Sequence, residues 1–238
     1  MTAALCNDVL VLGVDEAGRG PVLGPMVMAA VAISGRKAGA LSRMGVRDSK
    51  AFGAGADAQA ARAALVPRIR GLAEAVAVRV VDVDDIDRAV RRGDLNRLER
   101  EHALVLIRVL PEVRRVLCDG ARLFGPLATT VPHLKALDRG EEAHVAVAAA
   151  SVVAKVRRDE IFACIAARYR REFGPLAGGG YCNAPTRAFL RAYVERYRRL
   201  PPEARRSWPH AGVLDLLAPG FDPLSTLPPG PGDQLSLL

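Results

Sequence analysis

The octet Val14-Asp15-Glu16-Ala17-Gly18-Arg19-Gly20-Pro21 constrains the fold more than any other segment of this chain. It ends an apolar run, residues 9–14, which is rich in Val and Leu and lacks helical spacing; this predicts a buried strand followed by a glycine turn. Adjacent acids at a strand end face a shared pocket, and several carboxylates in one pocket can hold divalent cations. Glycines beside Arg19 let backbone amides approach a sugar-phosphate closely, and the arginine adds a cation. The octet is therefore typical of a metal-dependent phosphodiesterase site.

The rest of the chain alternates segments that are typical of strands and helices. Strands are expected where apolar, Val-rich runs occur, at residues 26–33, 75–83 and 113–118. Helices are expected where apolar residues recur at helical spacing, at residues 56–72, from 84 onward, at 96–109, at 145–173 and from 185 to about 199. The helix at 145–173 is rich in small residues in its first half, which should pack closely against the sheet. This alternation predicts an α/β core with helices on both faces.

The composition and charge of the chain suit one folded domain that binds a polyanion. The 238 residues, 50% of them hydrophobic, can bury one well-packed core. A formal net charge of +8 favours a polyanionic partner, and arginine suits forked contacts to phosphate. The four cysteines form no Cys-x-x-Cys pair, so we interpret them as reduced, small core residues. The N-terminus lacks the pattern of a signal peptide, and no apolar run approaches the ~20 residues of a membrane span, so a soluble, cytoplasmic protein is expected.

Seven segments, in order, resemble the signature motifs of the type 2 ribonucleases H, specifically the ribonuclease HII family, over roughly residues 9–212. They are the octet, Asp48-Ser49-Lys50, Leu95-Asn96-Arg97-Leu98-Glu99, Cys118-Asp119-Gly120, the helical motif of residues 148–159, Gly180-Tyr181 with Pro185-Thr186, and Arg205-Arg206-Ser207-Trp208. The resemblance implies a ribonuclease H-like α/β fold, with a central mixed sheet flanked by helices and a helical C-terminal extension.

The resemblance also implies a catalytic site of four acids that hold two Mg²⁺ or Mn²⁺ ions. Asp15, Glu16 and Asp119 match three of these acids. The family's fourth acid is an aspartate ten residues before the serine of the helical motif, and counting back from Ser151 reaches Glu141. The related ribonuclease HIII group carries a glutamate there, and Glu142 and Asp138 are close alternatives. The departure leaves open the metal preference and the balance between single-ribonucleotide and long-hybrid substrates.

By the same resemblance, several residues are expected to bind the substrate, an RNA–DNA hybrid or duplex DNA that contains ribonucleotides. Those implied to contact the ribose 2′-hydroxyl are Gly18, Arg19 and Gly20. Tyr181 would pack against the adjacent deoxyribose, although Cys182-Asn183-Ala184 replaces the proline-containing spacing of the family. Ser151 and Lys155 are four residues apart, hence on one helix face, and would grip phosphate, with Lys50 as a weaker candidate.

Other charged residues have less specific interpretations. Nothing in the motifs requires His144, so a structural or solvated role is expected for it. The arginines at 168, 170 and 171 and those at 196, 198, 199, 205 and 206 could follow the nucleic-acid backbone, or could simply form solvated helix faces.

The chain is expected to divide into a catalytic domain, residues 1–218, and a flexible Pro- and Gly-rich tail, residues 219–238. The tail ends in Gln234-Leu235-Ser236-Leu237-Leu238, which resembles the peptide by which bacterial replication and repair proteins bind the sliding clamp. In such peptides Gln234 would be the polar anchor, and Leu235, Leu237 and Leu238 would supply apolar contacts in a groove. A featureless tail is the alternative.

The sequence therefore predicts an endoribonuclease that cuts RNA in RNA–DNA hybrids and on the 5′ side of ribonucleotides embedded in duplex DNA. Two alternatives stay open. One is a ribonuclease HIII-like preference for hybrids with several ribonucleotides. The other is a non-catalytic hybrid-binding protein, against which the retained carboxylates argue, because a binder gains nothing from acids beside phosphate.

Overall fold

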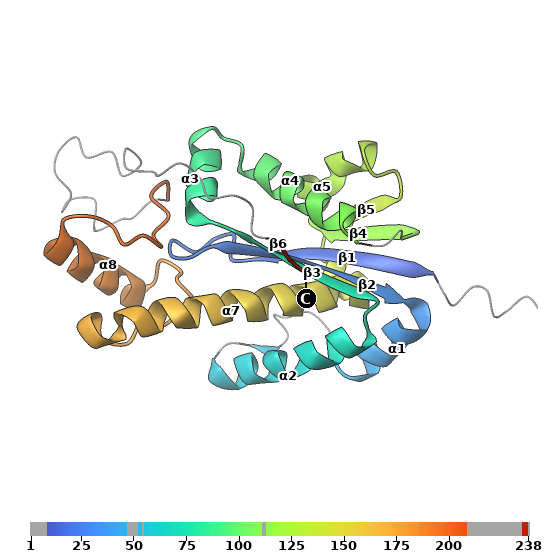
Figure 1. The fold of residues 1–238 in the computed structure, drawn as a ribbon, viewed down its shortest axis with the longest axis horizontal. Coiled ribbons are helices and arrows are strands. Elements are labelled where there is room, and N and C mark those ends of the chain that lie inside the picture. The colour runs from blue at the N-terminus through green and yellow to red at the C-terminus, as the bar shows by residue number, and fades with distance from the viewer. Residues whose placement is uncertain (1–8, 47–51, 54, 111–112, 209–234, 238) are drawn as a thin grey trace, which may run out of the picture.

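A computed structural model describes residues 9–46, 52–53, 55–110, 113–208 and 235–237. Its centre is a mixed sheet in the order β5-β4-β1-β2-β3-β6 (Figure 1). The strands are β1 (Leu10–Ala17), β2 (Met26–Ser34), β3 (Ala75–Val81), β4 (Arg115–Asp119), β5 (Leu134–Leu137) and β6 (Leu235–Leu237). β1 pairs in parallel with β4 and β4 with β5, whereas the pairs of β1 with β2, β2 with β3 and β3 with β6 are antiparallel.

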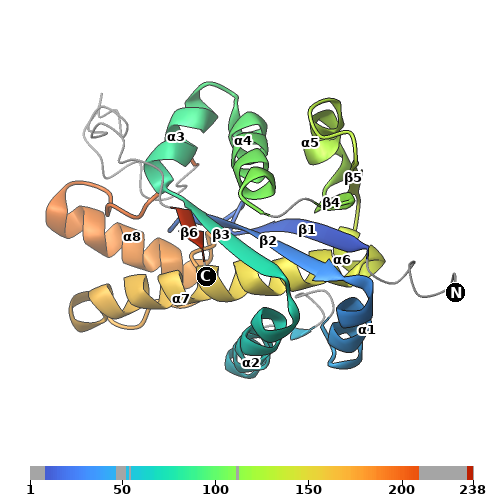
Figure 2. The same cartoon turned by 45° about the vertical axis from the view of Figure 1, so that its right-hand side comes forward.

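Helices cover both faces of this sheet, which confirms the predicted α/β core. One face carries α1 (Gly35–Arg43), α2 (Ala56–Leu72) and α7 (Val145–Phe173), and the other carries α3 (Val83–Arg91), α4 (Leu95–Arg108) and α5 (Ala121–Phe124) (Figures 1 and 2). Short turns of helix, η3 (Gly125–Thr129) and α6 (Gly140–Ala143), flank β5. The last long helix, α8 (Ala184–Tyr197), lies beside the far end of α7 (Figure 1).

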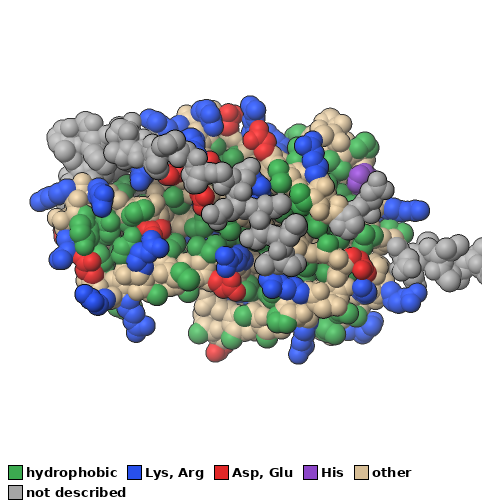
Figure 3. Space-filling view, viewed as in Figure 1, with side chains coloured by type: hydrophobic (Ala, Val, Ile, Leu, Met, Phe, Trp, Pro, Cys, Tyr) green, Lys and Arg blue, Asp and Glu red, His purple; other side chains and the backbone are tan. Residues whose placement is uncertain are grey.

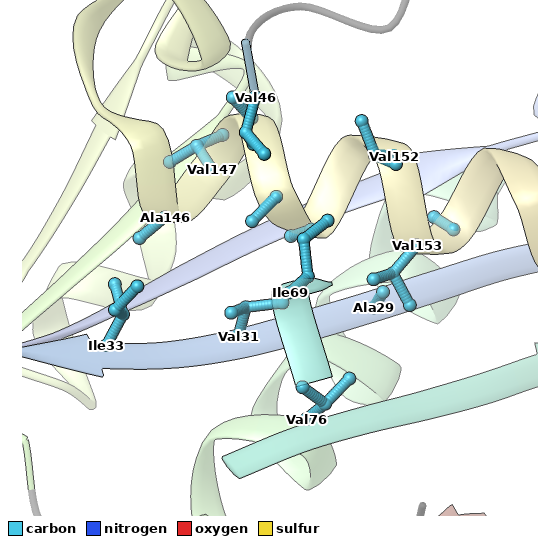
Figure 4. Close-up of a cluster of buried hydrophobic side chains, with 14 of the residues drawn as sticks. Ala29, Val31, Ile33, Val46, Ile69, Val76, Ala146, Val147, Val152 and Val153 are labelled. Atoms are coloured by element: carbon cyan, nitrogen blue, oxygen red, sulfur yellow. The ribbon is translucent and has the colours of Figure 1, made fainter. Parts of the chain in front are cut away.

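The main core lies between the sheet and α7, where small side chains allow a close approach (Figure 4). The first half of α7 buries an almost unbroken run of Ala and Val residues against β1 and β2. The closest point is Gly13 of β1, where an added Cβ would lie only 2.1 Å from the backbone carbon of Ala146. The prediction that small residues bring this helix close to the sheet is confirmed.

The second half of α7 extends the fold beyond the sheet and packs against α8. An aromatic cluster joins the two helices: the ring centroids of Tyr169 and Phe189 lie 4.9 Å apart, and those of Phe173 and Tyr193 lie 5.6 Å apart. Such contacts between aromatic rings add to the free energy gained from burying their area. This cluster explains why the C-terminal helical extension stays attached to the core.

Some expectations were wrong in detail. Val83 begins α3 and does not end β3, because the chain turns at Asp82. Two elements were not expected at all: β5, whose four residues are too few to show a strand period, and α1. Of the cysteines, Cys118 is buried as expected, but Cys164 and Cys182 are exposed and so are not core residues.

Two further expectations concern the tail and membranes. The structure describes three residues of the tail, and these pair with β3 as strand β6, whereas the sequence predicted no regular structure there. Within the described ranges, no helix is long and apolar enough to span a membrane.

Candidate active site

A cavity of about 260 Å³ opens at the end of β1 and gathers most of the predicted site residues. It is lined by Asp15, Glu16, Ala17, Gly18, Arg19, Gly20, Pro21, Asp119, Ser151, Lys155, Arg158, Asp159, Gly179 and Tyr181. Lys50 lies outside the described residues. These side chains come from β1, the loop after it, β4, α7 and the loop before α8, so segments distant in the sequence build one site.

Sheet topology explains why the acids meet. β1 and β4 are parallel neighbours, and Val14 is paired with Cys118, so the residues that follow them, Asp15 and Asp119, end at the same edge of the sheet. α7 packs against β1 and places Ser151 beside Asp15, with its hydroxyl hydrogen-bonded to the carboxylate. In this structure Ser151 therefore holds an acid as well as lining the cavity.

Burial and like charge dominate the electrostatics of the cavity. Burial, and then the neighbouring Glu16, raise the pKa of Asp15 well above its ordinary value, against which the Ser151 hydrogen bond acts. Burial, and then Glu99 and Asp119, raise the pKa of Glu16 to about 7. Such carboxylates are costly to ionise together unless a cation joins them.

These pKa shifts predict how stability depends on pH in the metal-free protein. Because the folded-state pKa of Glu16 lies above its unfolded value of 4.5, its stabilising contribution is present below pH 4.5 and is lost as the pH rises through 7. We expect the free energy of unfolding to fall by about 2 to 3 kcal/mol over that range in EDTA. Chemical denaturation at pH 5 and pH 8 measures this. Glu16→Gln should make the dependence shallower and leave the part that comes from Asp15, whose pKa burial also raises.

The three candidates for the fourth acid differ in their surroundings. Glu141 is buried, and the amide of the preceding Gly140 donates a 2.6 Å hydrogen bond to Asp119 Oδ1. Glu142 is exposed and lies 3.9 Å from Arg139, and Asp138 accepts a hydrogen bond from the amide of the residue after Gly120. Of the three, Glu141 is the buried one and follows the residue that contacts Asp119, although Glu141 itself does not line the cavity.

The donor set fits a divalent cation in its chemistry. Carboxylate oxygens are the ligands that Mg²⁺ prefers, and the acids at the cavity are crowded enough to raise one another's pKa. As the side chains stand, however, no three His, Cys, Asp or Glu residues of the described chain already form a metal-binding cluster. The acids would therefore hold an ion only after their side chains turn toward it.

Two buried arginines fix the loop that carries the octet's glycines. Arg205 is fully buried and donates to the carbonyl oxygens of Gly18, Arg19 and Gly24, the last two at 2.7 and 2.9 Å. Arg158 donates from the other side to the carbonyls of Leu23, at 2.7 Å, and Gly179, at 3.2 Å. Arg205 is thus a buried organiser of the loop, and its interpretation as a surface contact for nucleic acid was wrong.

Removing Arg205 should cost both stability and activity. Arg205→Ala would leave buried carbonyl oxygens without hydrogen-bond donors. We expect it to lower the free energy of unfolding by about 3 kcal/mol or more. Burial, and then Arg158, lower the pKa of Arg205 only to about 9, so the side chain is charged at neutral pH. Urea denaturation checks this. The exposed Arg187 offers a control, since Arg187→Ala should change stability by less than about 0.5 kcal/mol.

The remaining predicted residues surround the cavity mouth. Tyr181 is 54% exposed, and its ring lies over Gly20, where an added Cβ would sit 3.5 Å from Cε1. Lys155 pairs with Asp159, one turn further along α7. Asp159 also lies 3.7 Å from the buried Arg62.

His144 caps α7, since its Nδ1 accepts a hydrogen bond from the amide of Ala146, and this confirms a structural role.

Basic side chains are not gathered into one stripe. On the face shown in Figure 3, Lys and Arg side chains are spread around the outline, with Asp and Glu among them. On this face, therefore, the basic side chains form no continuous patch that would mark a binding site.

The sequence model of the family described as Ribonuclease HII matches residues 12–211. The chain belongs to the ribonuclease HII family. A ribonuclease HII from Methanothermobacter thermautotrophicus is 37% identical over 214 residues, which cover 83% of this chain and 95% of that protein. The predicted membership is confirmed, and the chain is an endoribonuclease of the ribonuclease H type.

Solved structures confirm the ribonuclease H-like fold. Ribonuclease H2 from Pyrococcus horikoshii OT3 has a TM-score of 0.74 at 28% identity and covers 85% of this chain and 95% of its own. The ribonuclease HII of Archaeoglobus fulgidus, solved in a complex with PCNA, has a TM-score of 0.70 at 28% identity. The match covers 84% of this chain and 96% of that one. Bst-RNase HIII, solved with Mn²⁺, has a TM-score of 0.64 at 22% identity, covers 88% and 71%, and shows the fold alone.

Sequence reasoning assigned no role to three residues that shape this ribonuclease HII site. Glu99 and Asn96 lie in a segment that resembled the family, but nothing in their spacing showed that both contact Arg19. Asp87 of α3 is fully buried and accepts from the amides of Arg206 and Ser207, which fixes the turn that carries Arg205. The sequence signal that could have revealed Asp87 is a charged residue on an otherwise apolar face of a predicted helix.

Proposed function

We propose that this protein uses two divalent ions to hydrolyse the RNA strand of RNA–DNA hybrids. It would also cut duplex DNA on the 5′ side of an embedded ribonucleotide. The observation that carries the proposal is the meeting of Asp15, Glu16 and Asp119 at one sheet edge, in a cavity that also holds Arg19 and Lys155. Acids that bind metal, beside cations that bind phosphate, suit phosphodiester hydrolysis.

The proposed metal ligands are Asp15, Glu16, Asp119 and Glu141. When bound, Mg²⁺ or Mn²⁺ would activate a water and stabilise the leaving 3′ oxygen, so that the products carry a 3′-hydroxyl and a 5′-phosphate. The Ser151 hydroxyl, which hydrogen-bonds to Asp15, favours the ionised form of that carboxyl. The protein's own contribution is thus to bring the carboxylates to one sheet edge, where their side chains can turn toward an ion.

Substrate selection is assigned to the loop after β1 and to Tyr181. The carbonyls of Gly18 and Arg19 are bound to Arg205, so this stretch of backbone is held rigidly where a ribose 2′-hydroxyl would be read. The 2′-hydroxyl is the group that distinguishes RNA from DNA at a given position. Tyr181, exposed over Gly20, would pack against the adjacent deoxyribose, and Lys155 would bind a nearby phosphate.

The test of this proposal is cleavage of an end-labelled RNA–DNA hybrid with Mg²⁺, with Mn²⁺ and with EDTA. The expected result is metal-dependent cutting of the RNA strand, with products that a polymerase can extend because they carry 3′-hydroxyls. Cutting that is equally fast in EDTA would contradict the role of the acids. Binding of the hybrid without any cleavage would favour the non-catalytic alternative.

The second candidate specificity is that of ribonuclease HIII, which the glutamate at position 141 favours. Glutamate supplies the same carboxylate as aspartate, but its side chain is one methylene longer, so the carboxylate lies at a different distance from the backbone. This difference would affect which ion is preferred and how many ribonucleotides the preferred substrate contains. Glu141→Asp, which restores the aspartate of the ribonuclease HII motif, is the variant that tests this. We expect it to shift activity toward single embedded ribonucleotides and leave the fold unchanged.

The C-terminal peptide is proposed to bind a sliding clamp through Gln234, Leu235, Leu237 and Leu238. A solved relative is in complex with PCNA, which supports a clamp as a partner of this chain as well. In this structure Leu235–Leu237 pair with β3, so clamp binding would require release of a three-residue strand. We also propose that the protein acts in the cytoplasm.

Deletion of residues 234–238 should abolish clamp binding without affecting cleavage. The described residues that line the cavity include none from this peptide, and the peptide is the proposed contact with the clamp. Binding to an immobilised clamp measures the first effect, and cleavage of a short hybrid measures the second. Unchanged clamp binding after the deletion would remove the clamp assignment.

A further inference from the structure

Glu99 is a buried acid of the active-site region that none of the family motifs required as a metal ligand. It is fully buried on α4, whereas the proposed metal acids come from β1, β4 and α6. Its Oε1 lies 2.7 Å from Nε of Arg19, and its Oε2 has no hydrogen-bond partner among the described residues. A buried carboxylate with one unused oxygen is costly, so its presence calls for a function.

Asn96 shares the same partner. It lies three residues before Glu99, so both side chains leave one face of α4, and its Oδ1 accepts a 2.7 Å hydrogen bond from Nη2 of Arg19. The two acceptors therefore bind two different nitrogens of one guanidinium. A planar fork held at two nitrogens cannot rotate as a free arginine does.

The rest of Arg19 is fixed as well. Its carbonyl accepts a 2.7 Å hydrogen bond from Nη1 of Arg205, which anchors the backbone. The Arg19 side chain remains 45% exposed and lines the cavity. A guanidinium has five N–H donors, and the two bonds to α4 use the one on Nε and one of the two on Nη2. Both donors of Nη1 and the second donor of Nη2 are left for a ligand in the cavity.

We propose that Glu99 and Asn96 are positioning residues that aim Arg19 at a backbone phosphate of the bound nucleic acid, and so determine substrate affinity. The inference rests on the proposed function, since it requires a nucleic acid in the cavity. Phosphate is the assigned ligand because a guanidinium edge matches two phosphate oxygens, and an arginine held in place loses less freedom on binding.

Two alternatives to this proposal give results that differ from it. If Glu99 were a fifth metal ligand, Glu99→Gln would act like Glu99→Ala and would change the Mn²⁺ dependence of melting. If the pair only stabilised the fold, all variants would lose stability and substrate affinity together. If Glu99 positions Arg19, Gln should substitute for it, because its amide oxygen can accept from Nε.

The experiment measures equilibrium binding of a fluorescent RNA–DNA hybrid in EDTA, where no cleavage occurs. Arg19→Ala should weaken binding about tenfold or more and reduce the salt dependence by about one phosphate contact. Glu99→Ala should weaken it by a similar factor and Asn96→Ala by a smaller one. Glu99→Gln should bind within about threefold of the original chain.

A double-mutant cycle decides the matter. Glu99→Ala should add little to Arg19→Ala, because the group that it positions is already gone. Additive losses would overturn the proposal, and so would an Arg19→Ala variant that binds as well as the original chain. If the original chain does not bind the hybrid at all, the proposed function itself fails, which is a distinguishable outcome.

The chain offers a matched control on the same helix. Glu101 and Arg97 form an exposed pair at 2.8 Å, similar in chemistry to Glu99 and Arg19. Glu101→Ala should leave hybrid binding unchanged. Because Glu99→Ala could unfold the chain, each variant's melting temperature is measured, and the Glu99→Gln result keeps the proposal falsifiable if the Ala variant is unstable.

Discussion

Asp15→Asn is expected to reduce cleavage by at least about a thousandfold while hybrid binding in EDTA stays within about threefold. The asparagine keeps the shape of the side chain but removes a negative charge from the proposed metal site. Because burial and Glu16 raise the pKa of Asp15, the neutral variant should also be more stable than the original chain in EDTA at pH 7. Higher stability with lost activity would exclude unfolding as the cause.

Asp57 provides the control for this substitution. It is exposed in the first turn of α2, away from the cavity, so Asp57→Asn should retain full activity. An Asp15→Asn variant that cuts at the original rate would show that the acids at the end of β1 are not the catalytic ones.

Gly13→Ala is expected to have the largest effect on stability. The added Cβ would lie 2.1 Å from the backbone carbon of Ala146 and 2.3 Å from the amide nitrogen of Val147, so β1 and α7 would have to separate. We expect the free energy of unfolding to fall by about 3 to 5 kcal/mol, a large part of the total for a domain of this size. The midpoint of urea denaturation measures this change.

Gly71 is the matched control for this second substitution. It lies within α2, and an added Cβ would meet nothing within 4 Å. Gly71→Ala should therefore be neutral or should stabilise the chain by up to about 1 kcal/mol, through helix propensity. Equal losses at Gly13 and Gly71 would contradict the close packing of β1 against α7.

The long elements could be predicted from the sequence because their pattern repeats many times. The bounds expected for α2 and α7 agree with the structure, since each presents many residues at helical spacing. β5 could not be found because four residues carry too little periodicity. Pairing of Leu235–Leu237 with β3 depends on an exposed sheet edge that only the folded chain presents.

The meeting of Asp15, Glu16 and Asp119 at one sheet edge could be predicted because the motifs around them resembled those of a family. The residues that organise the site could not. Glu99, Arg158 and Arg205 belong to residue types that usually lie at the protein surface. Only the tertiary structure shows that they are buried against the cavity loop and its arginine. From the sequence, Gly13 is only a residue that weakens a strand. The structure shows that it allows the backbone of α7 to approach β1 closely.

The most direct test of the central claim uses duplex DNA that contains one ribonucleotide, incubated with the purified protein and Mg²⁺ or Mn²⁺, beside a long RNA–DNA hybrid. We predict metal-dependent cleavage on the 5′ side of the lone ribonucleotide, with a glutamate at position 141 serving as the fourth acid. Cleavage of the hybrid alone would mean ribonuclease HIII-like specificity. No metal-dependent cleavage of either substrate would contradict the assignment of a catalytic metal site to Asp15, Glu16 and Asp119.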